Sequence, residues 1–250
     1  MNGDTVGRTD LELNLSPGGV IVSAGPIAVY NGLVATTGNY GSDSRQAQYG
    51  QILSGAPGVT LTNTGVYPKN ETTTDSFLDG TTDGTYNYMI GANSSAQGTI
   101  YRCGLDWSNP TPVASMGQPI DFTGITYDPV SQSLWVIGRG SVFFSMFEVT
   151  LPSSPGRVNY LQSFAFVGST AADALAMDVD RTLWMADLNN QGTLLHYDRS
   201  GNYLGSYTPA DTFVRPLGGE IALPEPASFA LLLISITQLS QRRRNLRREE

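Results

Sequence analysis

Residues 174–207 read ALAMDVDRTLWMADLNNQGTLLHYDRSGNYLGSY, and this stretch decides the fold class. Short apolar and aromatic runs, such as TLWMAD and TLLHYD, alternate with turn-forming groups, such as SGN at 200–202. Glycine and asparagine at such places supply the positive φ angles that tight turns between strands require. The same alternation continues through residues 17–220, where the sequence shows no long apolar pattern with a helical period. The sequence therefore predicts an all-β body.

The quoted stretch also has a counterpart 49 residues earlier in the chain. The matching segments are GITYD at 124–128 with SLWV at 133–136, and ALAMD at 174–178 with TLWM at 182–185. Trp135 and Trp184 thus occupy equivalent places. A fainter copy consists of DGTYNY at 83–88 and GTIYRC at 98–103. A period of about 40–50 residues, with about four strands in each unit, is typical of propeller blades.

The repeat resembles those of NHL-like and YncE-like β-propellers, and the similarity is clearest over residues 80–210. It implies a propeller-like body over residues 1–220, with four to five blades of about 47 residues each. A closed ring of four or five blades and a chain that lacks its first blade or two both fit this length. A β-sandwich with two coincidentally similar hairpins is the alternative fold.

Charge and cysteine content exclude several classes of function. The net charge is −8, and residues 1–224 carry 9 basic against 19 acidic side chains, so nucleic acid is not expected as a partner. One cysteine, Cys103, and one histidine, His196, exclude a disulfide framework and a zinc site rich in cysteine and histidine. We expect Cys103 to be buried and inert, and His196 to be structural.

The last 30 residues, 221–250, differ from the body and form a second predicted segment. Pro224, Glu225 and Pro226 exclude a helix or a central strand at that point. An uncharged apolar stretch follows over 227–239, and its anchoring side chains are Ala227, Phe229, Leu231, Leu232, Leu233, Ile234, Ile236 and Leu239. A basic cluster ends the segment, with Arg242, Arg243 and Arg244 first and Arg247 and Arg248 after them.

This order resembles the PEP-CTERM sorting signal, whose bearers are exported substrates of exosortase, a membrane-embedded cysteine protease of Gram-negative bacteria. The resemblance implies that Pro224, Glu225 and Pro226 are the processing motif. It also implies that 227–239 is a short helix that anchors the chain transiently in the inner membrane, and that Arg242–Arg244 stop its transfer. The apolar span is shorter than the roughly 20 residues that cross a bilayer. A buried or amphipathic C-terminal helix is the alternative.

Residues 1–16, MNGDTVGRTDLELNLS, lack the basic start and the apolar run of a secretory signal. An exported protein must nevertheless cross the membrane. We therefore expect that Met1 is internal to a longer coding sequence or that the start is misassigned.

Acidic and aromatic residues supply the remaining candidates. Asp75, Asp79 and Asp83 could gather around Ca²⁺, as could the aspartates at 178, 180 and 187, although turn hydrogen bonds are the commoner use of aspartate in β-proteins. A carbohydrate-stacking role is open to Tyr40, Tyr49, Tyr67, Tyr86, Tyr88, Trp107, Tyr127 and Tyr203. Because it lies outside the repeat, Trp107 is the candidate for an exposed contact, whereas Trp135 and Trp184 are expected in the blade core.

The leading hypothesis is a non-enzymatic protein, exported to the cell envelope or the extracellular matrix, with a propeller-like module that binds a glycan or a protein. No catalytic residue, resident metal or cofactor is assigned. The alternative is a propeller enzyme of the calcium-dependent lactonase or polysaccharide lyase type. A third reading is a cytosolic β-protein with a basic helical tail.

Overall fold

The computed structural model describes part of the chain, and every statement about structure below refers to that part. The described residues are 24–30, 33–38, 48–52, 59–63, 77–91, 98–118, 120–140, 144–166, 172–187, 189–190 and 193–208. The predicted sorting segment over 221–250 lies outside them. Within the described residues no helix is long and apolar enough to span a membrane.

The described chain forms four sheets, and the four antiparallel strands of each are here called blades 1 to 4. Blade 1 contains β1 (Ala24–Tyr30), β2 (Leu33–Gly38), β3 (Gln48–Ile52) and β4 (Val59–Asn63). Blade 2 contains β5 (Phe77–Thr82), β6 (Asn87–Gly91), β7 (Thr99–Cys103) and β8 (Thr111–Ser115). Blade 3 contains β9 (Asp121–Asp128), β10 (Ser133–Arg139), β11 (Phe144–Thr150) and β13 (Asn159–Ala165). Blade 4 contains β14 (Ala172–Met177), β15 (Leu183–Asp187), β16 (Thr193–Tyr197) and β17 (Tyr203–Tyr207).

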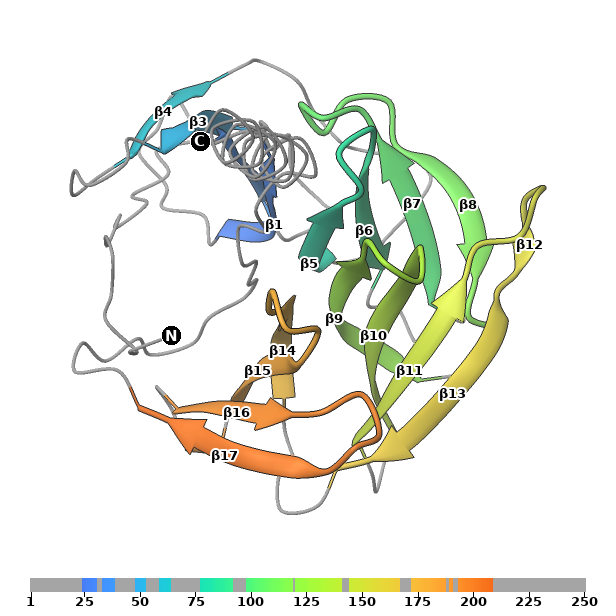
Figure 1. Ribbon diagram of the computed structural model, residues 1–250. Helices are drawn as coiled ribbons and strands as arrows, with labels where there is room; N and C mark the ends of the chain where they lie inside the picture. Colours follow the sequence, from blue (N-terminus) through green and yellow to red (C-terminus); the bar gives the residue numbers. More distant parts are fainter. Residues whose placement is uncertain are drawn as a thin grey trace, which may run out of the picture.

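The first strands of the four blades line the centre of the arrangement (Figure 1). β5 packs against β1 on one side and β9 on the other, and β9 packs in turn against β14. The short strand β12 (Gly156–Arg157) leaves blade 3 and pairs in parallel with β8, so it ties the outer edges of blades 2 and 3. The described residues thus confirm an all-β, propeller-like body and not a two-sheet sandwich.

Alternation along the strands places the core between blades. On β10, Leu134 and Val136 pack against blade 2, while Trp135 and Ile137 pack against blade 4. Successive side chains of a strand point to opposite faces of its sheet, so each inner blade supplies two hydrophobic faces. A third cluster, which includes Ala28 and Trp107, joins blades 1 and 2.

The repeat found in the sequence coincides with the blades. Trp135 pairs with Thr126 of β9, and Trp184 pairs with Ala176 of β14. Both tryptophans therefore lie on the second strand of their blades, in the same register. Tyr88 on β6, paired with Thr81 of β5, holds this place in blade 2. The fainter copy in the sequence is thus a true third unit.

Candidate functional site

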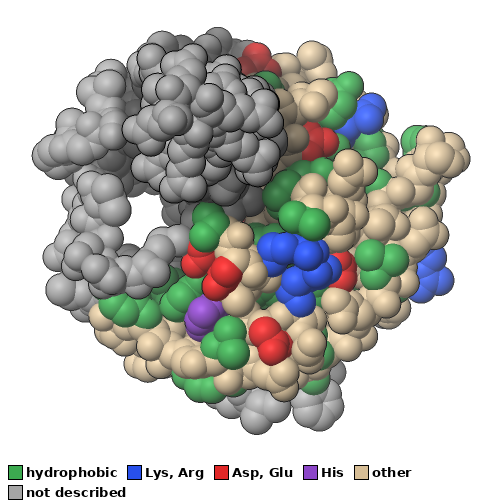
Figure 2. Space-filling view, viewed as in Figure 1, with side chains coloured by type: hydrophobic (Ala, Val, Ile, Leu, Met, Phe, Trp, Pro, Cys, Tyr) green, Lys and Arg blue, Asp and Glu red, His purple; other side chains and the backbone are tan. Residues whose placement is uncertain are grey.

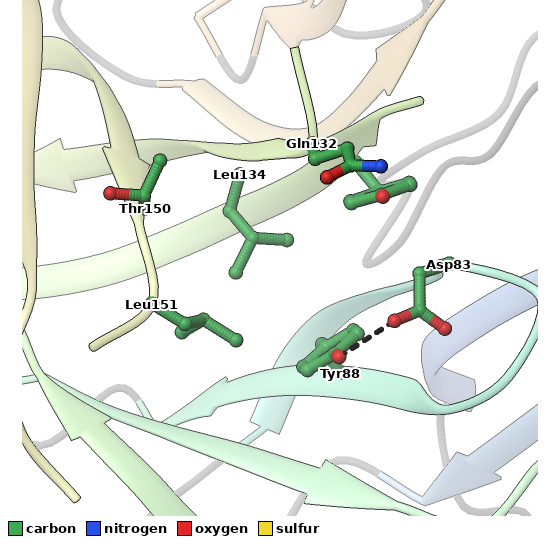
Figure 3. A pocket seen from close by; sticks show the side chains of 7 residues that line it. Asp83, Tyr88, Gln132, Leu134, Thr150 and Leu151 are labelled. Atoms are coloured by element: carbon green, nitrogen blue, oxygen red, sulfur yellow. Dashed lines mark hydrogen bonds between the residues drawn. The ribbon is translucent and has the colours of Figure 1, made fainter. Parts of the chain in front are cut away.

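A shallow pocket of about 160 Å³ lies where blades 2 and 3 meet (Figure 3). Its lining comes from the β5–β6 turn and β6 of blade 2, and from β9, the β9–β10 turn, β10 and the end of β11 in blade 3. The lining residues are Asp83, Tyr88, Tyr127, Gln132, Leu134, Thr150 and Leu151. Tyr88 and Tyr127 belong to the aromatic residues that the sequence offers for stacking on a sugar.

Asp83 and Tyr88 form a fixed polar pair in this pocket. The Tyr88 hydroxyl donates to Asp83 Oδ2 over 2.8 Å, and Figure 3 draws this bond. Asp83 Oδ1 accepts from the backbone N–H groups of Thr85 and Tyr86, each over 2.7 Å, which closes the turn. Burial, reinforced by the bond to Asp83, raises the pKa of Tyr88. The hydroxyl therefore keeps its proton, which is directed at Asp83, and offers the pocket its lone pairs.

Gln132 adopts an unusual backbone conformation at the mouth of the pocket. Its φ is 53°, in the left-handed region, and its side chain is exposed. The corresponding turns between the first and second strands also contain a left-handed residue, Gly84 with φ 83° in blade 2 and Arg181 with φ 66° in blade 4. Only glycine adopts this region without steric strain, and other residues lose roughly 1–2 kcal/mol there. Blade 3 thus keeps a long polar side chain where a glycine would be more stable.

Three polar groups of the pocket remain unused by the described part of the protein. The Tyr127 hydroxyl, the Gln132 amide and the Thr150 hydroxyl make no hydrogen bond there. Burial, with Asp83 and Asp128 nearby, raises the pKa of Tyr127, so its hydroxyl stays protonated and can donate. The pocket therefore offers donors and acceptors that the fold itself does not need.

A charged cluster lies behind the β9–β10 turn, between blades 3 and 4. Arg181 donates to Asp128 Oδ2 over 2.7 Å, and Arg199 donates to Glu148 Oε1 over 2.6 Å. The carboxylates are buried, with 0% and 3% of their side chains exposed, whereas the arginines are 32% and 28% exposed. The Arg199 guanidinium also lies 5.6 Å from the centre of the Trp135 ring. Figure 2 shows arginine side chains gathered beside acidic ones on this face.

Hydrogen bonds hold both buried carboxylates in the ionised form. Burial alone would raise the pKa of each, but the bonds outweigh burial and keep each pKa below its ordinary value. The side-chain donors are Arg181 and Ser131 for Asp128, and Ser133, Gln162 and Arg199 for Glu148. Both carboxylates therefore serve the contact between blades 3 and 4.

Asp79 has a role that the sequence does not reveal. Its buried carboxylate accepts from the backbone N–H of Gly80 over 2.9 Å through Oδ1. Through Oδ2 it accepts from Ile125 on β9 over 2.9 Å and from Leu175 on β14 over 2.8 Å. One side chain thus joins the first strands of three blades. Asp79 and Ile125 are 46 residues apart, close to the length of one repeat, so the bond joins corresponding strands of neighbouring blades.

The remaining acidic candidates do not gather into a metal site. Among the described residues, no three His, Cys, Asp or Glu side chains lie close enough together to hold a metal ion. Asp178 and Asp180 make turn hydrogen bonds, to Val179 and to Thr182 respectively. Asp75 lies outside the described residues. Calcium binding stays a prediction.

The lone histidine and the lone cysteine both have structural surroundings. His196 stacks on Trp184 with ring centres 4.0 Å apart and planes 7° from parallel. Its Nε2 lies 2.6 Å from the Thr182 hydroxyl, which itself donates to Asp180. Cys103 is buried, and burial raises the pKa of its thiol to about 12, so it is not a nucleophile at neutral pH.

The prediction that Trp107 is an exposed contact is wrong. Its side chain is completely buried in the cluster between blades 1 and 2. The ring packs against Gly80, where an added Cβ would come within 2.4 Å of it. The turn-forming residues around Trp107 suggest exposure, but the turn folds inward and places the ring over Gly80 of β5.

The predicted processing motif, anchor and basic stop, from Pro224 to Arg244, lie outside the described residues. Their roles stay predictions.

The chain matches no protein-family model and no curated protein. Solved structures give distant similarities. Apo AztD from Citrobacter koseri aligns with a TM-score of 0.40 and 10% identity, over 76% of this chain and 48% of AztD. The PQQ-bound aldose sugar dehydrogenase from Streptomyces coelicolor aligns with a TM-score of 0.46 and 12% identity, over 84% of this chain and 71% of the enzyme. A Lactobacillus plantarum protein aligns with a TM-score of 0.43 and 15% identity, over 75% of this chain and 57% of that protein.

The chain spans about half the length of AztD. The four sheets and their packing, rather than these similarities, define the fold.

Proposed function

We propose that the protein is an exported binding module of the cell envelope or extracellular matrix, which is processed at its PEP-CTERM tail. In this proposal an exosortase-type protease cleaves near Pro224, Glu225 and Pro226 after the following apolar segment has anchored the chain in the inner membrane. The propeller-like body then remains outside the cytoplasm and binds a small polar ligand in the pocket between blades 2 and 3.

The conformation of Gln132 carries the binding part of the proposal. The backbone is strained at this position, the amide has no partner in the described protein, and the side chain lies at a pocket. Strain of this kind persists where the position has another use. We infer that this use is a hydrogen bond from the Gln132 amide to a bound ligand.

The alternative is a propeller enzyme of the calcium-dependent lactonase or polysaccharide lyase type. The module is favoured because the buried carboxylates named above already have structural partners: Asp79 holds backbone N–H groups, while Asp128 and Glu148 hold arginines. A direct assay separates the two functions. Calcium-dependent, chelator-sensitive turnover of a lactone or a polysaccharide by the full chain would contradict the module.

Export is tested by the intact mass and the compartment of the protein in its own host. We expect a mature species that ends near Pro224–Pro226 in the envelope or the medium. Replacing Pro224 and Pro226 by alanine should leave the tail attached, whereas the control Pro216→Ala should be processed normally. A full-length chain of 26.8 kDa in the cytoplasm would contradict the proposal.

A further inference from the structure

We infer that the pocket between blades 2 and 3 binds one uncharged sugar residue through its hydroxyl groups. The inference rests on the proposed function, because it names the ligand of the same pocket. It does not depend on processing of the tail, so the two can fail separately.

The unused hydrogen-bonding groups match a ring of hydroxyls. Tyr127 and Thr150 each present a hydroxyl that can donate and accept, and the Gln132 amide presents two donors and an acceptor. Tyr88 adds a pure acceptor, because its proton is committed to Asp83. A sugar hydroxyl also donates and accepts, so one ligand can satisfy all four side chains. A ligand that only accepts would leave the Tyr88 oxygen without a partner.

The apolar lining matches the rest of such a ring. Leu134, which is 3% exposed, and Leu151 face the pocket, and in Figure 3 Leu134 lies between Thr150 and Tyr88. A pyranose presents C–H groups on its faces and hydroxyls around its edge. In Figure 3 Leu134 and Leu151 lie next to each other, and Asp83, Tyr88 and Gln132 lie to one side of them, so the lining offers the ligand both apolar and polar contacts.

Charge selects an uncharged sugar. Asp83 is the one charged residue in the lining, so a uronate or a phosphate would meet a carboxylate. The nearby arginines do not offset it, because Arg181 and Arg199 are bound to Asp128 and Glu148. An amine is the competing ligand, because the carboxylate of Asp83 keeps its charge; with three hydrogen bonds already accepted, it has one lone-pair position left for a further donor.

Size limits the ligand to one ring. The volume of about 160 Å³ is well below the roughly 300–1,000 Å³ of sites for drug-sized molecules. The pocket therefore accepts the terminal residue of a glycan, while the remainder of the chain stays in solvent.

Saturation-transfer NMR and calorimetric titration of the full-length chain test this inference. The probes are methyl glucoside, methyl galactoside, methyl mannoside and methyl N-acetylglucosaminide, compared with methyl glucuronide and with lysine methyl ester. We expect saturable binding of at least one uncharged glycoside, and weaker or no binding of the two charged probes. Tyr127→Phe should weaken binding by about 3–10-fold, the loss of one hydrogen bond.

The matched control is Tyr203→Phe, which makes the same change at an exposed tyrosine of β17 outside the pocket. It should bind as the wild type does. The inference is overturned if no uncharged glycoside binds, if either charged probe binds more tightly than all of them, or if Tyr127→Phe and Tyr203→Phe behave alike. Preferential binding of the lysine ester would leave the pocket a binding site but make its partner a basic peptide.

Discussion

Blades 2, 3 and 4 carry the same aromatic position and the same turn aspartate but use them differently. In blade 2 the Tyr88 hydroxyl donates to Asp83, and in blade 4 the Trp184 indole donates to Asp178 over 3.2 Å. In blade 3 the corresponding Trp135 is buried, and its indole N–H has no acceptor in the described structure.

The aspartate of blade 3, Asp128, is bound by arginines of blade 4 instead. Arg181 reaches it from the left-handed position of the β14–β15 turn, with φ 66°. The bond within a blade is thereby replaced by an ion pair between blades. The repeated sequence positions thus determine the strands, and the turn between the first and second strands determines the contact with the preceding blade. Arg181 in this turn of blade 4 forms an ion pair with blade 3, whereas Gln132 in this turn of blade 3 lines a pocket against blade 2.

The largest loss of stability is expected from removing the Asp79 carboxylate, which joins the first strands of blades 2, 3 and 4. Asp79→Ala removes the acceptor of three backbone N–H groups in a buried region. Each such group costs about 1–3 kcal/mol when it is left without a partner, so the free energy of unfolding should fall by about 3–5 kcal/mol. Denaturant titration measures this. A fall below about 1 kcal/mol would show that Asp79 does not tie the blades together.

Removing the ion pair should weaken the contact between blades 3 and 4. Arg181→Met keeps the length of the side chain but leaves Asp128 buried with only Arg199, 3.5 Å away, as its cationic partner. We expect the free energy of unfolding at pH 7 to fall by about 2 kcal/mol, somewhat less than for a fully buried pair.

The matched control for this change is Arg139→Met, because the Arg139–Asp121 pair is exposed and should contribute about 0.5 kcal/mol or less. Equal losses in the two variants would contradict the distinction between a buried inter-blade pair and a surface pair.

Acid should weaken the same junction. Because the pKa values of Asp128 and Glu148 are lowered in the folded protein, their stabilisation is complete above the ordinary values of 3.8 and 4.5 and is lost as the pH falls below them. The free energy of unfolding, followed by denaturant titration from pH 6 to pH 3, should therefore decline below about pH 4.5. Arg181→Met should flatten this decline, and an unchanged slope would contradict the assignment.

Local sequence signals predict the strands of this protein better than its site. The alternation of apolar runs with turn residues, and the 49-residue spacing of Trp135 and Trp184, were enough for an all-β repeat. Contacts between blades depend on side chains that are distant in sequence, such as Asp79 with Leu175, 96 residues away. No short sequence motif indicates these contacts between blades.

The sequence predicts the pocket only in part, because its residues are also distant from one another in the chain. Tyr88 and Tyr127 are among the aromatic residues that the sequence offers for stacking on a sugar, yet nothing in the sequence indicates that they lie together. No local sequence pattern singles out Gln132. An alignment of the turns between first and second strands indicates the position, because blade 2 has the left-handed Gly84 in its turn where blade 3 has Gln132.

Gln132→Gly tests whether Gln132 serves a ligand at the expense of the fold, when its stability and its sugar binding are measured together. If Gln132 is kept for a ligand at the expense of the fold, glycine should leave the free energy of unfolding unchanged or raise it by up to about 1 kcal/mol, because the backbone strain is relieved. The affinity for the uncharged glycoside should fall at least about 3-fold, the loss of one amide hydrogen bond. A less stable variant that binds as tightly as the wild type would contradict the account.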